Sequence, residues 1–256
     1  MDINKKIYFA SDFHLGAPDR KTSLEREKRI VQWLYEIKKD AAEIYLMGDL
    51  FDFWFEYKTA IPKGYTRLLG KIAELTDSGI PVSVFTGNHD MWMFDYLHEE
   101  LGVTIYRKPI EREYNGKKFF LAHGDGLGPG DHGYKFIKKV FANPVCQWLF
   151  ARIHPNLGIG IANYWSRKSR LAQGKETFKG EENEYLVSFV KEKLMTEHFD
   201  YFIFGHRHLP LTIPIGDALY INLGEWVNFS TYAVFDGEKL ELKEYKKDNS
   251  NPINHL

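Results

Sequence analysis

Five short apolar segments of this chain each stop at a cluster of glycine, aspartate, asparagine or histidine. Each segment is rich in β-branched or aromatic side chains, which is typical of a buried strand. The five strands are expected at residues 7–10, 44–47, 82–85, 119–122 and 201–204. Helical stripes of apolar residues at 24–38 and 67–76 separate the first three of them. This alternation of strands and helices predicts an α/β fold with parallel pairing in its first half.

The rest of the chain departs from this alternation in two ways. Strand-like segments at 211–215, 218–222, 231–235 and 239–244, with a turn at Asp236-Gly237, indicate antiparallel pairing. Residues 130–180 have no strand pattern, and their apolar residues recur at helical spacing in short helices separated by Pro144 and Pro155. We therefore expect one mixed α/β domain over 1–245 with a helical insertion at about 130–180, and then a polar tail at 246–256.

The composition excludes several classes of protein. The chain has 256 residues, of which 44% are hydrophobic and 27% are charged, as in an ordinary globular domain. No apolar run approaches the roughly 18 residues that a membrane-spanning helix needs. The formal net charge of -1 gives no indication of nucleic-acid binding. With one cysteine, Cys146, and no signal-peptide pattern at the start, the chain is expected to be cytoplasmic.

Positive charge is concentrated in one segment of the sequence. Between residues 131 and 175 there are eight Lys or Arg against a single acid, Asp131. Such a segment suits an anionic ligand or peripheral contact with the anionic surface of an inner membrane. A basic face that is merely solvated fits the charge equally well.

The polar clusters at the strand ends have the residue types of a metal centre. They are Asp12-x-His14, Gly48-Asp49, Gly87-Asn88-His89-Asp90, His123-Gly124-Asp125 and Gly205-His206-x-His208. A lone histidine is more often structural, but five of the ten histidines lie in these clusters, which we expect at one edge of the sheet. Carboxylate, amide and imidazole groups together bind Mn, Fe, Zn or Mg. Two such ions about 3.5–4 Å apart can clamp both the attacking and the leaving oxygen of a displacement.

These five blocks, in this order, resemble the pattern of the calcineurin-like metallophosphoesterase superfamily. The resemblance implies a four-layer αββα sandwich of two mixed β-sheets, and two divalent metal ions, with Mn²⁺ favoured, that activate water against a phosphate ester. One ion would be held by Asp12, His14, Asp49 and His208, and the other by Asp49, Asn88, His123 and His206. His89 would stabilise the phosphoryl group or protonate the leaving oxygen, and Asp90 would orient His89. Asp52 would cap or orient a neighbouring group.

The middle of the chain resembles a narrower family, the UDP-2,3-diacylglucosamine hydrolases of lipid A biosynthesis. The shared features are His123-Gly124-Asp125, Asp131-x-Gly133-Tyr134, a basic helical segment, Ser166-Arg167-Lys168-Ser169 and Leu223-Gly224-x-Trp226. These enzymes cut a pyrophosphate to give UMP and an acylated sugar phosphate. The implied substrate contacts are Asn88, His89, Asp131, Ser166, Arg167, Lys168, Arg170, Lys175 and His206. The best-known branch has arginine where this chain has His89, and a sister branch has histidine there.

Two questions stay open at the level of sequence. The first question concerns the apolar residues of the insertion, which could either line a groove for acyl chains or pack its helices onto the sandwich. We expect most of them to pack onto the sandwich. These residues are Val140, Phe141, Trp148, Leu149, Phe150, Ile153 and Trp165. The alternative activity is that of a general phosphodiesterase, phosphatase or nuclease, the last disfavoured by the low net charge. A non-enzymatic scaffold that only binds metal is disfavoured because each expected ligand is present.

Overall fold

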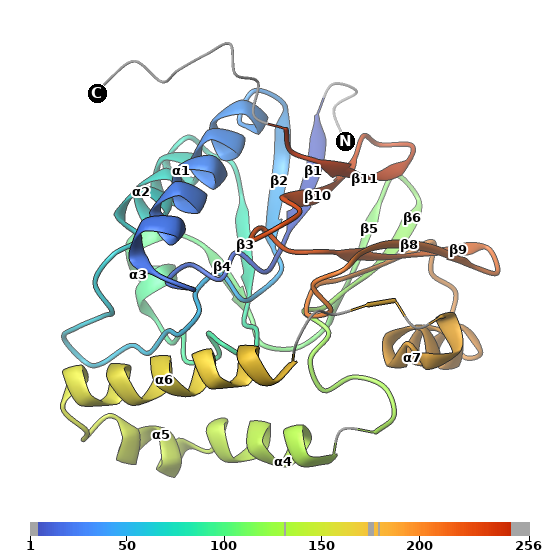
Figure 1. Cartoon of the computed structure of the whole chain (residues 1–256). Helices are drawn as coiled ribbons and strands as arrows, with labels where there is room; N and C mark the ends of the chain where they lie inside the picture. Colours follow the sequence, from blue (N-terminus) through green and yellow to red (C-terminus); the bar gives the residue numbers. More distant parts are fainter. Residues whose placement is uncertain (1–4, 131, 174–176, 179, 247–256) are drawn as a thin grey trace.

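Two β-sheets packed face to face form the frame of the molecule, and helices cover their outer faces (Figure 1). The computed structural model describes residues 5–130, 132–173, 177–178 and 180–246, apart from the side chains at 167 and 169–173. The mixed α/β prediction and the predicted two-sheet sandwich are confirmed. Across the described part of the chain, no helix is long and apolar enough to span a membrane.

The first sheet has the strand order β11-β10-β1-β2-β3-β4. Its strands are β1 (Lys6–Ala10), β2 (Ala41–Leu46), β3 (Val82–Phe85), β4 (Thr104–Tyr106), β10 (Thr231–Phe235) and β11 (Leu240–Glu244). The strands β1 to β4 pair in parallel, as expected for the first half of the chain, and β10 joins β1 in antiparallel orientation. The carboxyl ends of β1, β2 and β3 consequently meet at one edge.

The second sheet has the order β5-β6-β7-β9-β8. Its strands are β5 (Ile110–Tyr114), β6 (Lys117–Leu121), β7 (Tyr201–Phe204), β8 (Pro210–Ile215) and β9 (Ala218–Leu223). Strands β6 and β7 pair in parallel, so the loops after them leave the sheet at the same end. The sequence pattern missed β4, which has only three residues, and β5, in which exposed residues alternate with partly buried ones.

Alternation of side chains along the strands builds three apolar layers. In β1, Phe9 points between the sheets, where it stacks on Tyr45 with ring centroids 5.3 Å apart, while Tyr8 and Ala10 face the helices outside. Helices α1 (Arg20–Ile37), α2 (Thr66–Asp77) and α3 (Tyr96–Leu101) cover the first sheet. Helix α7 (Tyr185–Leu194) covers the second. The side chain of Asp19 caps α1, which therefore begins earlier than the apolar stripe indicates.

Three helices lie side by side below the site edge and form what we call the cap (Figure 1). They are α4 (His132–Phe141), α5 (Pro144–Phe150) and α6 (Pro155–Gln173). Pro144 and Pro155 begin α5 and α6, as expected for a residue that lacks an N–H donor and ends the preceding helix. Helices α4 and α5 contain no buried residue, so the cap rests on the sandwich without a core of its own.

Candidate metal centre

The loops that leave the strands at the site edge have an unusual backbone. Asp12, His14, Asp49, His206 and His208 have φ angles of 55°, 45°, 53°, 67° and 54°. The left-handed region is uncommon for residues with a side chain, and such residues cluster at functional sites where the surrounding fold holds them. They follow β1, β2 and β7, so both sheets contribute to the same edge.

Two glycines allow these loops to approach one another closely. A Cβ atom on Gly205 would lie 2.5 Å from Oδ2 of Asp12, and one on Gly87 would overlap the carboxylate of Asp49. No side chain fits at either position without moving a carboxylate. The glycines therefore set the distance between the strand ends that carry the polar clusters.

A first group of four side chains, from both sheets, surrounds the end of β1. It consists of Asp12, His14, Asp49 and His208, whose ligand atoms all lie within 4.8 Å of one another. Nε2 of His14 is 3.0 Å from Nε2 of His208 and 3.6 Å from Oδ1 of Asp12. Nε2 of His208 is 3.3 Å from the same Asp12 oxygen. Because the two imidazoles point their Nε2 atoms at one place, this group has the donor set of a divalent metal site.

A second group shares Asp49 with the first. Asp49, His123 and His206 offer ligand atoms within 4.8 Å of one another. Nε2 of His123 is 3.4 Å from Oδ2 of Asp49 and 3.3 Å from Oδ1 of Asn88. The structure thus brings together all seven residues predicted as metal ligands.

The two oxygens of Asp49 have different environments. Oδ1 accepts a hydrogen bond of 2.8 Å from the backbone N–H of His89. Oδ2 is buried, accepts no hydrogen bond, and lies 3.9 Å from Nε2 of His14 and 3.4 Å from Nε2 of His123. A buried carboxylate oxygen without a donor is costly unless a cation compensates it. This oxygen faces both groups, so the residues present fit a pair of cations bridged by Asp49.

The tautomer of His123 suits metal binding. Its Nδ1 lies 2.8 Å from the backbone carbonyl of Met47, which can only accept a hydrogen bond. Nδ1 therefore carries the proton, and the lone pair of Nε2 faces Asp49 and Asn88. A carbonyl behind the imidazole is the usual means of orienting a histidine ligand.

The charges of the two groups shift the pKa values of their members in the metal-free protein. Burial opposes ionisation of Asp49, but the imidazoles of His123 and His89 outweigh it and hold the pKa of Asp49 well below its usual range. Burial likewise opposes protonation of His123, yet Asp49 raises its pKa to about 10. Burial and the charge of His123 lower the pKa of His206 to about 4. In the metal-free protein, the positive charge of protonated His123 therefore balances the charge of Asp49, as a bound metal ion would.

Asp90 does not have the orienting role that the sequence suggested. Its fully buried carboxylate accepts hydrogen bonds from the backbone N–H groups of Gly87, at 2.8 Å, and Leu50, at 2.7 Å. These bonds connect the loop after β3 to the loop after β2. Burial and the charge of Asp49 raise the pKa of Asp90 to about 7. The carboxylate holds the backbone on both sides of Asp49 and leaves the imidazole of His89 to other partners.

Asp52 and Ser166 are the partners of His89. Nδ1 of His89 lies 3.0 Å from the backbone carbonyl of Asp52 and 3.2 Å from Oγ of Ser166, and that hydroxyl donates to Oδ2 of Asp52 at 2.9 Å. These contacts place the proton on Nδ1 and turn Nε2 away from them. Asp52, His89 and His14 also form a third cluster of potential ligands, in which Oδ1 of Asp52 lies 3.9 Å from Nδ1 of His14 and 3.8 Å from Nδ1 of His89. Asp52 is therefore placed to orient the imidazole of His89, through its backbone carbonyl and through Ser166.

The predicted substrate contacts are only partly described. Ser166, on α6, reaches the site through Asp52 and His89. Lys168, on the same helix, is exposed. Asp131 and Lys175 lie outside the described residues, as do the side chains of Arg167 and Arg170.

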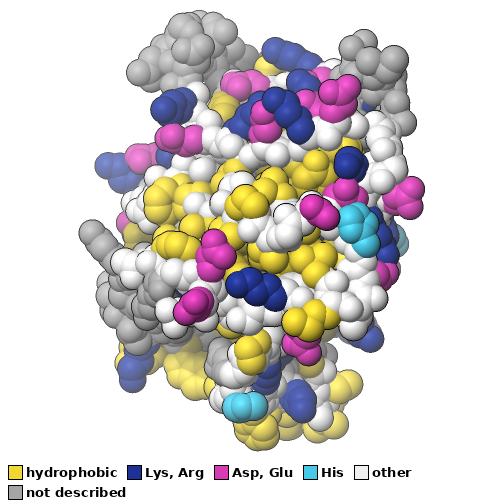
Figure 2. Space-filling model, turned by 90° about the vertical axis from the view of Figure 1, so that its right-hand side faces the viewer, with side chains coloured by type: hydrophobic (Ala, Val, Ile, Leu, Met, Phe, Trp, Pro, Cys, Tyr) yellow, Lys and Arg dark blue, Asp and Glu magenta, His cyan; other side chains and the backbone are white. Residues whose placement is uncertain are grey.

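The apolar residues of the cap divide into two sets. Phe141 and Phe150 pack on the buried side chains of Phe53, Phe55 and Trp92, which follow β2 and β3. Most of the others do not pack, contrary to expectation. The exposed apolar side chains of the cap are Phe136, Ile137, Val140, Val145, Trp148, Leu149, Leu157, Ile161, Tyr164 and Trp165. Figure 2 shows hydrophobic side chains gathered at the lower end of the molecule, where the cap lies.

Two ion pairs of buried carboxylates beside the metal groups were not predicted. Asp125, two residues after His123, accepts a hydrogen bond of 2.5 Å from Tyr134 Oη and pairs with Lys138 Nζ at 2.6 Å, both on α4. Glu184 accepts two hydrogen bonds, of 2.8 and 2.9 Å, from the guanidinium of Arg207. The only signal in the sequence was the presence of charged residues next to the motifs, which does not identify their partners.

Comparison with known proteins shows to which family this chain is similar. The model of the calcineurin-like phosphoesterase family matches residues 5–210. A UDP-2,3-diacylglucosamine hydrolase of Porphyromonas gingivalis is 40% identical over 94% of this chain and 98% of the relative. One of Yersinia pseudotuberculosis is 27% identical over 85% and 90%. A phosphoesterase from E. coli superposes with a TM-score of 0.46 at 17% identity, covering 92% of this chain and 90% of the other. This chain belongs to the calcineurin-like phosphoesterase family.

Proposed function

We propose that this chain hydrolyses the pyrophosphate bond of UDP-2,3-diacylglucosamine to UMP and 2,3-diacylglucosamine 1-phosphate, a step of lipid A biosynthesis. The relative from Porphyromonas gingivalis bears the name of this activity and matches almost the whole chain. The observation that carries the proposal is a pair of metal-binding groups sharing Oδ2 of Asp49, next to a cap with exposed apolar side chains. The charged centre suits the diphosphate, and the apolar cap suits the acyl chains.

The seven ligand residues would hold two divalent cations. When bound, the cations lower the pKa of water and neutralise charge on the phosphoryl oxygens. Asp49 would direct Oδ2 to both of them, while its Oδ1 stays on the backbone N–H of His89. Mn²⁺ is our choice of metal, because the mixed oxygen and nitrogen donors suit it, and Fe, Zn and Mg accept the same donors.

His89 would act on the reacting phosphate. Since Asp52 and Ser166 hold its Nδ1, the opposite ring nitrogen, Nε2, is left to contact a phosphoryl oxygen or to give a proton to the leaving oxygen. Ser166 belongs to α6, so the cap contributes a residue that orients this imidazole. The basic residues Arg167, Lys168, Arg170 and Lys175 of the same segment, together with Asp131, remain proposed substrate contacts.

The cap also suits peripheral contact with the anionic surface of an inner membrane. Exposed aromatic and aliphatic side chains can enter the headgroup region, and basic residues near them add about 1 kcal/mol each at an anionic surface. Sedimentation with vesicles tests this contact. The protein should pellet with vesicles that contain anionic phospholipid and stay in solution with neutral ones.

The activity is tested by measuring UMP release with Mn²⁺ from substrates that differ only in acylation. UDP-2,3-diacylglucosamine should be turned over at least about 100-fold more efficiently than UDP-N-acetylglucosamine or an aryl phosphodiester, a difference of about 2.7 kcal/mol. Chelation of the metal should abolish the release. Equal efficiency on all three compounds would refute the proposal in favour of a general phosphodiesterase.

A further inference from the structure

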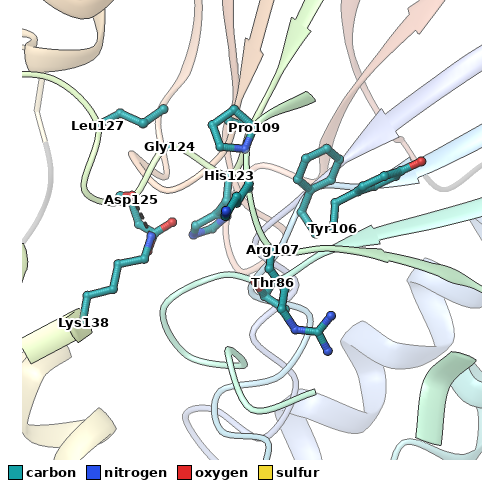
Figure 3. Close-up of a pocket in the computed structure, with 12 residues that line it drawn as sticks. Thr86, Tyr106, Arg107, Pro109, His123, Gly124, Asp125, Leu127 and Lys138 are labelled. Atoms are coloured by element: carbon teal, nitrogen blue, oxygen red, sulfur yellow. Dashed lines mark hydrogen bonds and ion pairs between the residues drawn. The ribbon is translucent and has the colours of Figure 1, made fainter. Parts of the chain in front are cut away.

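A cleft opens directly beside His123, between the ends of the two sheets (Figure 3). Its walls come from the end of β3, the segment between β4 and β5, the loop after β6, and α4. The lining residues used below are Thr86, Arg107, Lys108, His123, Asp125 and Lys138. The cleft encloses about 60 Å³ and is open to solvent, with about 340 Å³ when its open mouth is included, so most of a bound molecule would lie in that mouth.

The cleft is cationic. Arg107, Lys108 and Lys138 line it, against the single carboxylate of Asp125. Lys138 is held by Asp125, with its Nζ 2.6 Å from Oδ2 and 3.0 Å from the backbone oxygen. The guanidinium of Arg107 turns away from His123 in Figure 3 and donates to the carbonyls of Met93 and Phe94. Lys108 is the exposed cation at the mouth of the cleft and therefore the one best placed to meet an anion.

The position of the cleft limits what can occupy it. His123 is at once a wall of the cleft and a member of the second metal group, so the cleft adjoins that group. The substrate has two arms on its diphosphate, one acylated and one not. The exposed apolar side chains lie on the cap, whereas the hydroxyl of Thr86 and the three cations lie at the cleft. The acyl chains have no comparable apolar surface in this cleft.

We propose that the cleft beside His123 binds the nucleoside monophosphate half of the substrate, with Lys108 and Lys138 beside its phosphate and Thr86 available to its sugar or base. This assignment rests on the proposed function and gives the two arms of the substrate separate places. It also explains why a cap helix, α4, reaches the cleft through Lys138. The same helix that borders the acyl side would then border the nucleotide.

The test measures binding of UMP, inorganic phosphate and 2,3-diacylglucosamine 1-phosphate to the metal-loaded full-length protein by calorimetry. The variant is Lys108→Glu, which reverses a charge on an exposed side chain and should leave the fold intact. Lys39→Glu is the matched control, since Lys39 is exposed in the turn before β2, at the opposite edge of the sheet. Lys108→Glu should weaken UMP binding about tenfold relative to Lys39→Glu and leave the affinity for the acylated sugar phosphate unchanged.

Three results would overturn the assignment. They are no binding of UMP to the unaltered protein, equal UMP affinity in Lys108→Glu and Lys39→Glu, and equal affinity of the unaltered protein for UMP and inorganic phosphate, which would indicate only an anion site. The proposed function is judged separately by hydrolysis of UDP-2,3-diacylglucosamine. Hydrolysis with an unaltered UMP affinity in Lys108→Glu would reject the cleft and keep the function. Tight UMP binding that depends on Lys108, without hydrolysis of UDP-2,3-diacylglucosamine, would support the cleft and reject the proposed function.

Discussion

The metal centre and the cap are built in opposite ways. At the centre, Asp12, His14 and Asp49 are fully buried, and backbone N–H groups donate hydrogen bonds to the carboxylates of Asp12 and Asp49. In the cap, Trp148 and Trp165 are 56% and 60% exposed. The cap is attached mainly through Phe141 and Phe150 and a few polar contacts. The metal centre is therefore held by many buried contacts, whereas the cap is attached to the sandwich by few.

This difference separates two tasks. Holding two cations a few ångströms apart requires side chains that cannot move, which the sheet edge supplies through left-handed residues and glycines. Accepting a flexible acylated molecule requires apolar surface that is not already used for packing, which the cap supplies. Substitutions at the centre should therefore affect every substrate, and substitutions in the cap should affect only the acylated one.

Asp49→Ala should have the largest effect. It removes the one oxygen that faces both metal groups, and the loss of several kcal/mol of transition-state stabilisation corresponds to about 1,000-fold or more in kcat/KM. The decrease should be the same for UDP-2,3-diacylglucosamine and an aryl phosphodiester. Metal content by mass spectrometry should fall together with activity. A variant that keeps both metals and loses activity on only one substrate would contradict the separation of tasks.

Gly87→Ala should come next. The added methyl group overlaps the carboxylate of Asp49, so Asp49 must move away from the position in which its Oδ2 faces both metal groups. Displacing such a support typically costs about 10- to 100-fold in metal affinity or activity. Gly70→Ala is the matched control, because its Cβ would meet nothing within 4 Å on the exposed side of α2. The control should raise the free energy of unfolding by up to about 1 kcal/mol. Equal activity of both variants would show that the centre tolerates more movement than inferred.

Metal affinity should rise with pH because of His123. Asp49 raises the pKa of this imidazole to about 10, although burial opposes protonation, so His123 carries a proton at pH 7 in the metal-free protein. A metal can bind only after that proton leaves, so affinity should fall about tenfold per pH unit as pH drops from 8 to 6. Calorimetry in buffers of different ionisation enthalpy should detect about one proton released. Metal binding without proton release would refute this account.

The frame and the metal groups were predictable because they depend on local patterns. Short apolar strands end at motifs such as Asp12-x-His14 and Gly205-His206-x-His208. The sequence therefore indicates both where the strands end and which types of ligand lie there. The function of Asp90 was not predictable in this way. Adjacency to His89 suggested contact with the imidazole, yet the sharp turn of the loop after β3 directs the carboxylate to the backbone of Gly87 and Leu50.

The cap was predictable as helical but not in its packing. Apolar spacing predicts which residues share one face of a helix, and it does not say whether another element covers that face. Phe141 and Phe150 are covered because Trp92, far away in the sequence, lies against them. Trp148 and Leu149, on the same helix as Phe150, are more than half exposed. Pairs such as Ser166 with Asp52 depend on distances between loops that no local pattern contains.

The cap should give the smallest and most selective effect. Replacing Trp148 and Leu149 together by serine removes apolar surface that is more than half exposed, so the free energy of unfolding should change by less than about 0.5 kcal/mol. If the acyl chains bury this surface, KM for UDP-2,3-diacylglucosamine should rise about tenfold while turnover of an aryl phosphodiester stays constant. Met195→Ser, at the end of α7, is the control for loss of an exposed apolar side chain elsewhere. An equal loss on both substrates would mean that the cap acts on the metal centre instead of on the acyl chains, and the contrast between the two regions would then fail.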